Sequence, residues 1–152
     1  MKLSFIIPNM KGGGAERVLL NLINKLADYN DDYIIHLVLV KKEGHLLSEL
    51  NDNIIIYDLN KNQVRYCLFD LMRYLKTETP NYLISSLDYM NVISSLAHSL
   101  SNSNSKLFLW EHNNLSVHSK KTISKSLFLN KVIIKYFYSR ANKIIAVSNG
   151  VR

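Results

Sequence analysis

Three glycines lie between an apolar segment and an amphipathic one near the N-terminus. Gly12, Gly13 and Gly14 follow the strand-like residues Lys2–Pro8 and open the helical pattern of Gly14–Tyr29. Glycine has no Cβ, so backbone N–H groups in such a loop can approach a ligand closely, and a helix start presents its positive end to an anion. The loop is therefore predicted to contact a ligand such as a phosphate group. The alternative is a tight turn without a ligand.

Two common phosphate-binding loops do not fit these residues. A Walker loop requires Gly-Lys-Ser or Gly-Lys-Thr, which the sequence lacks. The dinucleotide fingerprint would require glycine at position 17, where Arg17 stands, and an acidic residue after the second strand, where Lys41 and Lys42 stand. NAD and FAD are therefore not expected as cofactors.

A second polar group, Trp110-Glu-His-Asn-Asn114, follows another strand-like segment. The imidazole of His112 could donate a hydrogen bond to a hydroxyl or phosphate near neutral pH, or it could only cap the loop. The other histidines and the single cysteine do not have the spacing of metal ligands, so no metal is expected.

The segment Thr122–Arg140 has a helical pattern with two unlike faces. At about 100° per residue, one face is apolar and the opposite face carries lysines, with apolar side chains projecting among them. Such a helix can lie on an anionic membrane surface, although a lysine-rich face is more often only solvated. The predicted membrane-contacting residues are Lys121, Lys125, Phe128, Lys131, Val132 and Lys135. Nucleic-acid binding is not expected, because no recognition motif accompanies the charge.

Short apolar segments alternate with helical patterns along the chain, as in a parallel sheet covered on both faces. This alternation predicts a single Rossmann-like domain over residues 1–152, a three-layer α/β sandwich with a mostly parallel six-stranded sheet in the order 3-2-1-4-5-6. The predicted strands are Lys2–Pro8, Tyr33–Val40, Asn53–Leu59, Tyr82–Ser86, Lys106–Glu111 and Lys143–Ser148, and the predicted helices are Gly14–Tyr29, Val64–Thr77, Tyr89–Leu100 and Thr122–Arg140, with a weakly helical link at 45–50.

Ligands of such sheets bind beyond the carboxyl ends of the strands, where the strand order reverses. The glycine loop and the group Trp110–Asn114 both belong to this edge, together with 86–91 and 148–150, so one site is expected there. The candidate ligand contacts at this edge are Asn9, Gly13, Gly14, Asp88, Glu111, Asn113 and Ser148.

The composition of the chain indicates the cellular compartment in which the protein is expected. The chain of 152 residues is 47% apolar, and none of its apolar segments approaches the ~20 residues that span a bilayer. The N-terminus does not fit a signal peptide, and Cys67 lies on an apolar helical face, so a cytoplasmic protein with a buried cysteine is expected. Residues 1–105 contain 10 Lys and Arg against 11 Asp and Glu, whereas residues 106–152 contain 9 against Glu111 alone. The basic final third indicates a surface that faces an anionic partner.

Taken together, three segments resemble the N-terminal domain of GT-B fold glycosyltransferases, in particular the retaining family 4 (glycosyl transferases group 1). They are "KLSFIIPNMKGGGAERVLLNLINKLA" at the start, "LWEHNN" after the fifth strand and "ANKIIAVSNGVR" at the end, so the resemblance covers essentially the whole chain.

The resemblance implies transfer of a sugar, with retention, from a nucleotide diphosphate sugar. It implies that Gly13 and Gly14 bring N–H groups to the donor diphosphate, that His112 lies beside the transferred sugar and that Ser148 lines the interdomain cleft. Catalysis would come largely from stabilisation of the departing diphosphate. Such enzymes commonly build surface polysaccharides on lipid-linked acceptors at the cytoplasmic face of the membrane, which agrees with the lysine-rich segment.

The family has a second domain that binds most of the nucleotide sugar and carries a Glu-x7-Glu motif, and these 152 residues do not include it. The chain by itself is therefore expected to be inactive and to bind nucleotide sugar weakly. The alternative function, which the residues leave open, is a non-catalytic single-domain module that docks on a membrane or on a partner.

Overall fold

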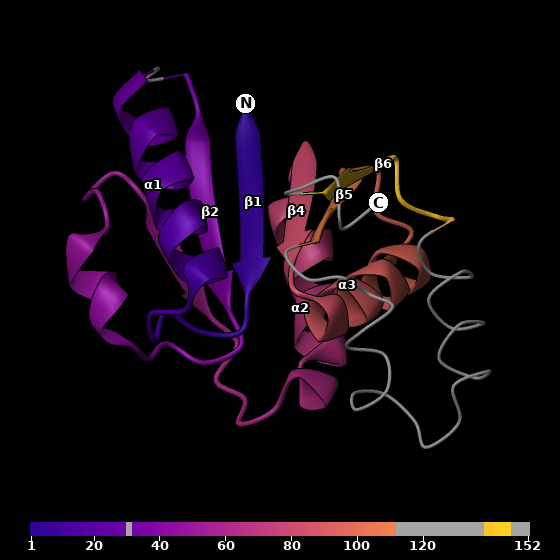
Figure 1. The fold of residues 1–152 in the computed structure, drawn as a ribbon. Helices are drawn as coiled ribbons and strands as arrows, with labels where there is room; N and C mark the ends of the chain where they lie inside the picture. Colours follow the sequence, from indigo (N-terminus) through magenta and orange to yellow (C-terminus); the bar gives the residue numbers. More distant parts are fainter. Residues whose placement is uncertain (30–31, 112–138, 147–152) are drawn as a thin grey trace.

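The computed structural model describes residues 1–29, 32–111 and 139–146 (Figure 1). Its elements in chain order are β1 (Lys2–Ile7), α1 (Gly14–Tyr29), β2 (Ile34–Leu39), the 3-10 turn η1 (His45–Glu49), β3 (Ile55–Asp58), the 3-10 turn η2 (Val64–Tyr66), α2 (Leu68–Glu78), β4 (Tyr82–Ser86), α3 (Asp88–Ser101), β5 (Lys106–Glu111) and β6 (Lys143–Ala146).

The six strands form one parallel sheet in the order β3-β2-β1-β4-β5-β6, which confirms the predicted topology. The chain builds outward from β1 to β3 on one side and then from β4 to β6 on the other. In the central register Phe5 of β1 pairs with Leu37 of β2 and with Ile84 of β4. The order therefore reverses between β1 and β4, and the carboxyl ends of these two strands mark the expected ligand edge.

Helices cover both faces of the sheet, which explains why the strands are apolar throughout (Figure 1). On one face, Phe5 and Ile7 of β1 pack in one cluster with Leu19 and Ile23 of α1. On the other face, the core contains Ile6 of β1 together with side chains of α2 and α3, among them Leu71, Leu75, Met90 and Ala97. The alternation within β1 thus divides one strand between two cores.

The predicted helix Val64–Thr77 is two elements in the structure. The turn η2 ends at Cys67, whose backbone N–H donates to the Val64 carbonyl, and α2 begins at Leu68. Cys67 is fully buried in the core, and burial raises the pKa of its thiol to about 12. The packing role predicted for this cysteine is therefore confirmed.

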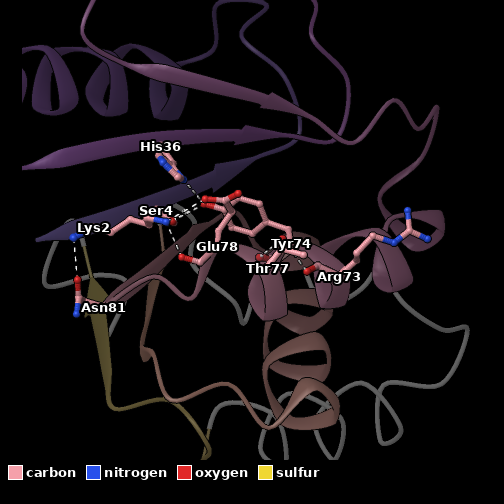
Figure 2. Close-up of polar contacts among 8 residues, drawn as sticks. All are labelled: Lys2, Ser4, His36, Arg73, Tyr74, Thr77, Glu78 and Asn81. Atoms are coloured by element: carbon pink, nitrogen blue, oxygen red, sulfur yellow. Dashed lines mark hydrogen bonds and ion pairs between the residues drawn. The ribbon is translucent and has the colours of Figure 1, made fainter.

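A polar cluster is buried between the sheet and α2 (Figure 2). The hydroxyl of Tyr74 lies 2.5 Å from Ser4 Oγ and 2.8 Å from His36 Nδ1, and all three residues are buried. Beside them, Lys2 Nζ pairs with Glu78 at 2.9 Å and lowers the pKa of that carboxyl group. Burial lowers the pKa of His36, so its imidazole is neutral and completes the cluster as a hydrogen-bonding partner.

Candidate functional site

The loop after β1 is held by the loop after β2. Met10 N donates to Glu43 O at 2.9 Å, and Leu46 N donates to Met10 O at 3.2 Å. Lys41 N also donates to Pro8 O at 3.0 Å. These backbone hydrogen bonds continue the β1–β2 pairing past the end of the sheet, so they hold the two loops together next to the glycines.

Gly44 is the glycine that this arrangement requires. Its φ of 121° is a backbone conformation that residues with a Cβ rarely adopt, and a Cβ added to Gly44 would overlap the backbone of Met10 and Lys11. Sequence reasoning misses this residue, because its partner lies more than 30 residues away and only the folded chain brings the two loops together.

The three glycines of the loop differ in what surrounds them. Gly14, the first residue of α1, is exposed and has no neighbour close to where a Cβ would be, so its backbone can be approached from outside. Beside Gly13, in contrast, lies the carboxylate of Glu16, in the space that a Cβ would occupy. Gly12 has a φ of 115° and faces the ring of His45. An anion at this helix start would meet Gly14 first, and it would displace the Glu16 side chain to reach Gly13.

Three lysines, Lys11, Lys41 and Lys42, form a cationic rim beside the glycine loop. Lys11, largely exposed, pairs with Glu43 at 2.9 Å, and Lys41 approaches the same carboxylate at 3.7 Å. The hydrogen bond from Lys11 lowers the pKa of Glu43, which therefore stays ionised at neutral pH. Two lysines share this single carboxylate, and Lys42 follows in the sequence, so the rim favours an anionic ligand.

The corner between β4 and α3 is strained. Leu87 has φ 80° and ψ 139°, a combination that non-glycine residues rarely adopt. Its N–H donates to the Trp110 carbonyl at 3.4 Å, and its carbonyl accepts from Asn91 N at 2.8 Å. Bonds from β5 and α3 thus hold the backbone in this conformation at the point where the strand order reverses.

The end of β5 is polar but buried. Glu111 is only 1% exposed, and Asn91 Nδ2 donates to its Oε1 at 2.6 Å. Burial, reinforced by Asp88, raises the pKa of Glu111 to about 8. This glutamate is therefore predominantly a neutral acid at pH 7, in contrast to the ionised Glu43 at the rim.

Further polar groups are buried in β4 and α3. Ser85, Ser86 and Ser94 are fully buried, and their hydroxyls have no hydrogen-bond partner within the described residues. Asn91 of α3 is the polar side chain that reaches across to β5.

The structure brings several of the predicted site residues to one edge of the sheet. Asn9, Gly13 and Gly14 follow β1, Asp88 opens α3, and Glu111 ends β5. The other predicted residues lie outside the described part of the chain: His112, Asn113, Lys121, Lys125, Phe128, Lys131, Val132, Lys135 and Ser148. Of the predicted helix Thr122–Arg140, the structure describes Ser139 and Arg140, which form a turn.

A groove of about 590 Å³ opens at the opposite edge of the sheet. Its lining includes Met1, Tyr82 and Lys106, which stand at the starts of strands. It therefore has no part in the site at the carboxyl ends. Among the described residues, no helix is long and apolar enough to cross a membrane, and no group of His, Cys, Asp and Glu side chains could hold a metal ion.

Solved structures share this architecture. The apo form of the lipopolysaccharide outer core galactosyltransferase WaaB superposes with a TM-score of 0.65 at 18% sequence identity, over 99% of this chain and 40% of that one. MurG from Acinetobacter baumannii superposes with a TM-score of 0.61 at 15% identity, over 99% of this chain and 42% of its own. No protein-family model matches the sequence, and no curated protein matches it either.

At these identities the comparisons establish the fold. The chain has the Rossmann-like α/β fold of a domain found in these GT-B proteins, and it spans about 40% of their length. This agrees, at the level of fold, with the resemblance that the glycine loop and the two later segments carry in the sequence.

Proposed function

We propose that the chain is the N-terminal, acceptor-side domain of a glycosyltransferase that uses a nucleotide diphosphate sugar. The observation that carries the proposal is the start of α1, where an open glycine backbone and a lysine rim meet at the point of strand reversal. A helix start with accessible N–H groups suits an anionic diphosphate. The shared fold with a galactosyltransferase over nearly the whole chain supports this choice over other phosphate ligands.

In this proposal Gly14, with Gly13 after movement of Glu16, donates N–H groups to the donor diphosphate. His112 acts beside the transferred sugar, and Ser148 lines the interdomain cleft. Asn9, Asp88, Glu111 and Asn113 belong to the acceptor side. No side-chain nucleophile is assigned, because stabilisation of the leaving diphosphate supplies the catalysis.

The finer features of the proposal rest on the sequence resemblance. They are retention of the anomeric configuration, membership of family 4, a lipid-linked saccharide acceptor in surface polysaccharide synthesis, and action from the cytoplasmic face of a membrane. A second domain would supply most of the donor site, so the 152 residues alone are proposed to be inactive and to bind the donor weakly.

Gly14→Ala tests the diphosphate site. Nothing lies near the position of the new methyl group, so the fold should persist, whereas the methyl group should obstruct the approach of a phosphate. In the wild-type chain, millimolar inorganic diphosphate or nucleoside diphosphates should shift the amide NMR signals of Gly13, Gly14 and Ala15. The variant should weaken this binding severalfold.

Lys25→Ala, on the exposed side of the same helix, is the matched control and should bind like the wild type. Shifts confined to the groove beside Met1 and Lys106, or equal binding by Gly14→Ala, would contradict the proposed site.

The membrane part of the proposal has a separate test. Wild-type chain should sediment with anionic phosphatidylglycerol vesicles at low salt, and glutamine at Lys121, Lys125, Lys131 and Lys135 should release most of it, because each lysine near such a surface contributes about 1 kcal/mol. The control replaces Lys25, Lys42, Lys76 and Lys106 and removes the same charge elsewhere. Equal release by both variants would show that only net charge matters.

A further inference from the structure

Two hydroxyl groups and an imidazole form a buried chain that joins α2 to the sheet (Figure 2). The Tyr74 hydroxyl of α2 lies 2.5 Å from Ser4 Oγ of β1 and 2.8 Å from His36 Nδ1 of β2. Ser4 and His36 are register partners in the pairing of these two strands. A single side chain of α2 is therefore bonded to two neighbouring strands.

The number of protons in this chain determines which group donates to which. Ser4 is 0% exposed, and among the described residues its side chain bonds to the Tyr74 hydroxyl alone. If Ser4 donates to Tyr74 and Tyr74 donates to His36 Nδ1, both hydroxyl protons have an acceptor. In the reverse order, the Ser4 proton is left in the core without an acceptor, which costs free energy. Nδ1 of His36 therefore accepts, and the ring carries its proton on Nε2.

The surroundings of His36 do not suit a charged ring. His36 is 2% exposed, and it forms no ion pair with any residue that the structure describes. The ring of Tyr57 in β3 packs against it, with 4.7 Å between the ring centroids. The charges that act on it from further away are Lys2 of β1 and Glu78 of α2, which pair with each other at 2.9 Å. A buried cation without a carboxylate partner is costly, so the fold favours the neutral ring.

We propose that Ser4, Tyr74 and His36 form an acid-sensitive latch between α2 and the sheet. While the imidazole is neutral, donation from Ser4 to Tyr74 and from Tyr74 to His36 holds α2 on β1 and β2. A proton taken up from solvent at Nδ1 removes the acceptor, reverses the order of donation and leaves a buried cation. The contact of α2 with the sheet should therefore loosen at mildly acidic pH. The proposal does not rest on the proposed function, and a failure to bind diphosphate would leave it standing.

The direction of the pH effect follows from proton linkage. Burial, reinforced by the charge of Lys2, lowers the pKa of His36 in the folded chain from the ordinary value of 6.5. Between 6.5 and this lower value, the unfolded chain binds a proton that the folded chain does not bind. The free energy of unfolding therefore falls as pH falls through this interval. Above the interval His36 is neutral in both states and contributes no pH dependence.

The direct test is a nitrogen-15 NMR titration of the histidine rings in the wild-type chain. At neutral pH His36 should show the Nε2–H tautomer, and its midpoint should lie below 6.5. Tyr74→Phe should raise that midpoint, because it removes the hydroxyl that donates to the neutral ring. An Nδ1–H tautomer or a midpoint at or above 6.5 in the wild type would overturn the proposal, as would an unchanged midpoint in Tyr74→Phe. The wild-type measurement needs no variant to fold.

His36→Asn supplies the second test. Its amide oxygen can accept from Tyr74 in place of Nδ1 and does not titrate, so the wild-type decline in urea midpoint from about pH 6.5 to about pH 5 should disappear. Amide exchange within α2, corrected for its intrinsic pH dependence, should rise over the same interval in the wild type alone. His45→Asn is the matched control: it removes an exposed histidine, and the decline should persist. A full decline in His36→Asn, or its loss in His45→Asn, would contradict the latch.

Discussion

Gly44→Ala should lower the free energy of unfolding by about 3–5 kcal/mol, combining a strained backbone conformation with overpacking. The residue has a φ of 121°, and its new methyl group would overlap the backbone of Met10. Backbone cannot rotate away as a side chain can, so the loops after β1 and β2 must part. The hydrogen bonds of Met10 to Glu43 and to Leu46 should be lost with them.

Urea unfolding measures the change in stability, and amide exchange at Met10 and Leu46 reports the parting of the loops. Gly14→Ala is the matched control: it makes the same chemical change in the neighbouring loop, where the space is open. It should be neutral or slightly stabilising, because alanine favours a helix more than glycine does. Equal effects of the two substitutions would contradict the close approach at Gly44.

Tyr74→Phe should lower the free energy of unfolding by about 2–3 kcal/mol, because it removes one hydroxyl that serves two buried polar groups. Without it, Ser4 Oγ and His36 Nδ1 lose the partner that lies 2.5 Å from one and 2.8 Å from the other. The ring remains, so apolar packing in the core is preserved and the loss isolates the polar cluster.

Tyr66→Phe is the control for this change. Tyr66 is 55% exposed, and its hydroxyl accepts a hydrogen bond from Arg65 at the surface. Water replaces such a partner, so the midpoint of urea unfolding should move little. Should Tyr74→Phe be equally mild, the cluster would contribute nothing beyond its packing.

The fold was predictable because its signals are local. Phe5, Ile6 and Ile7 form an uninterrupted apolar segment, and such segments alternating with helices restrict the sheet to few orders. The break at Cys67 was not predictable in this way. The apolar pattern of the sequence continues through Cys67, and the two elements differ only in backbone conformation, a 3-10 turn in η2 and an α-helix in α2.

The location of the candidate site was predictable from the sequence, whereas the contacts between distant segments that form it were not. The rule that ligands bind where strand order reverses locates Asn9, Gly14 and Asp88 correctly at one edge. Contacts between distant segments carry no local signal. Gly44 must be a glycine because the backbone of Met10 lies where a Cβ would be, and Asn91 forms a hydrogen bond with Glu111, which lies 20 residues further along the chain. For His112 and Ser148 the roles stay predictions, since both lie outside the described residues.

The central position of β1 has a consequence for how the chain is made. β1 pairs on one side with β2 and on the other with β4, where Leu3 lies opposite Tyr82, and it is synthesised before both of them. One edge of β1 must therefore wait until some 80 further residues have been synthesised, a delay of about 4–16 s at typical translation rates. An unpaired apolar strand edge is a template for aggregation. This topology therefore requires that the nascent edge of β1 be protected, for example by chaperones, until β4 has been made.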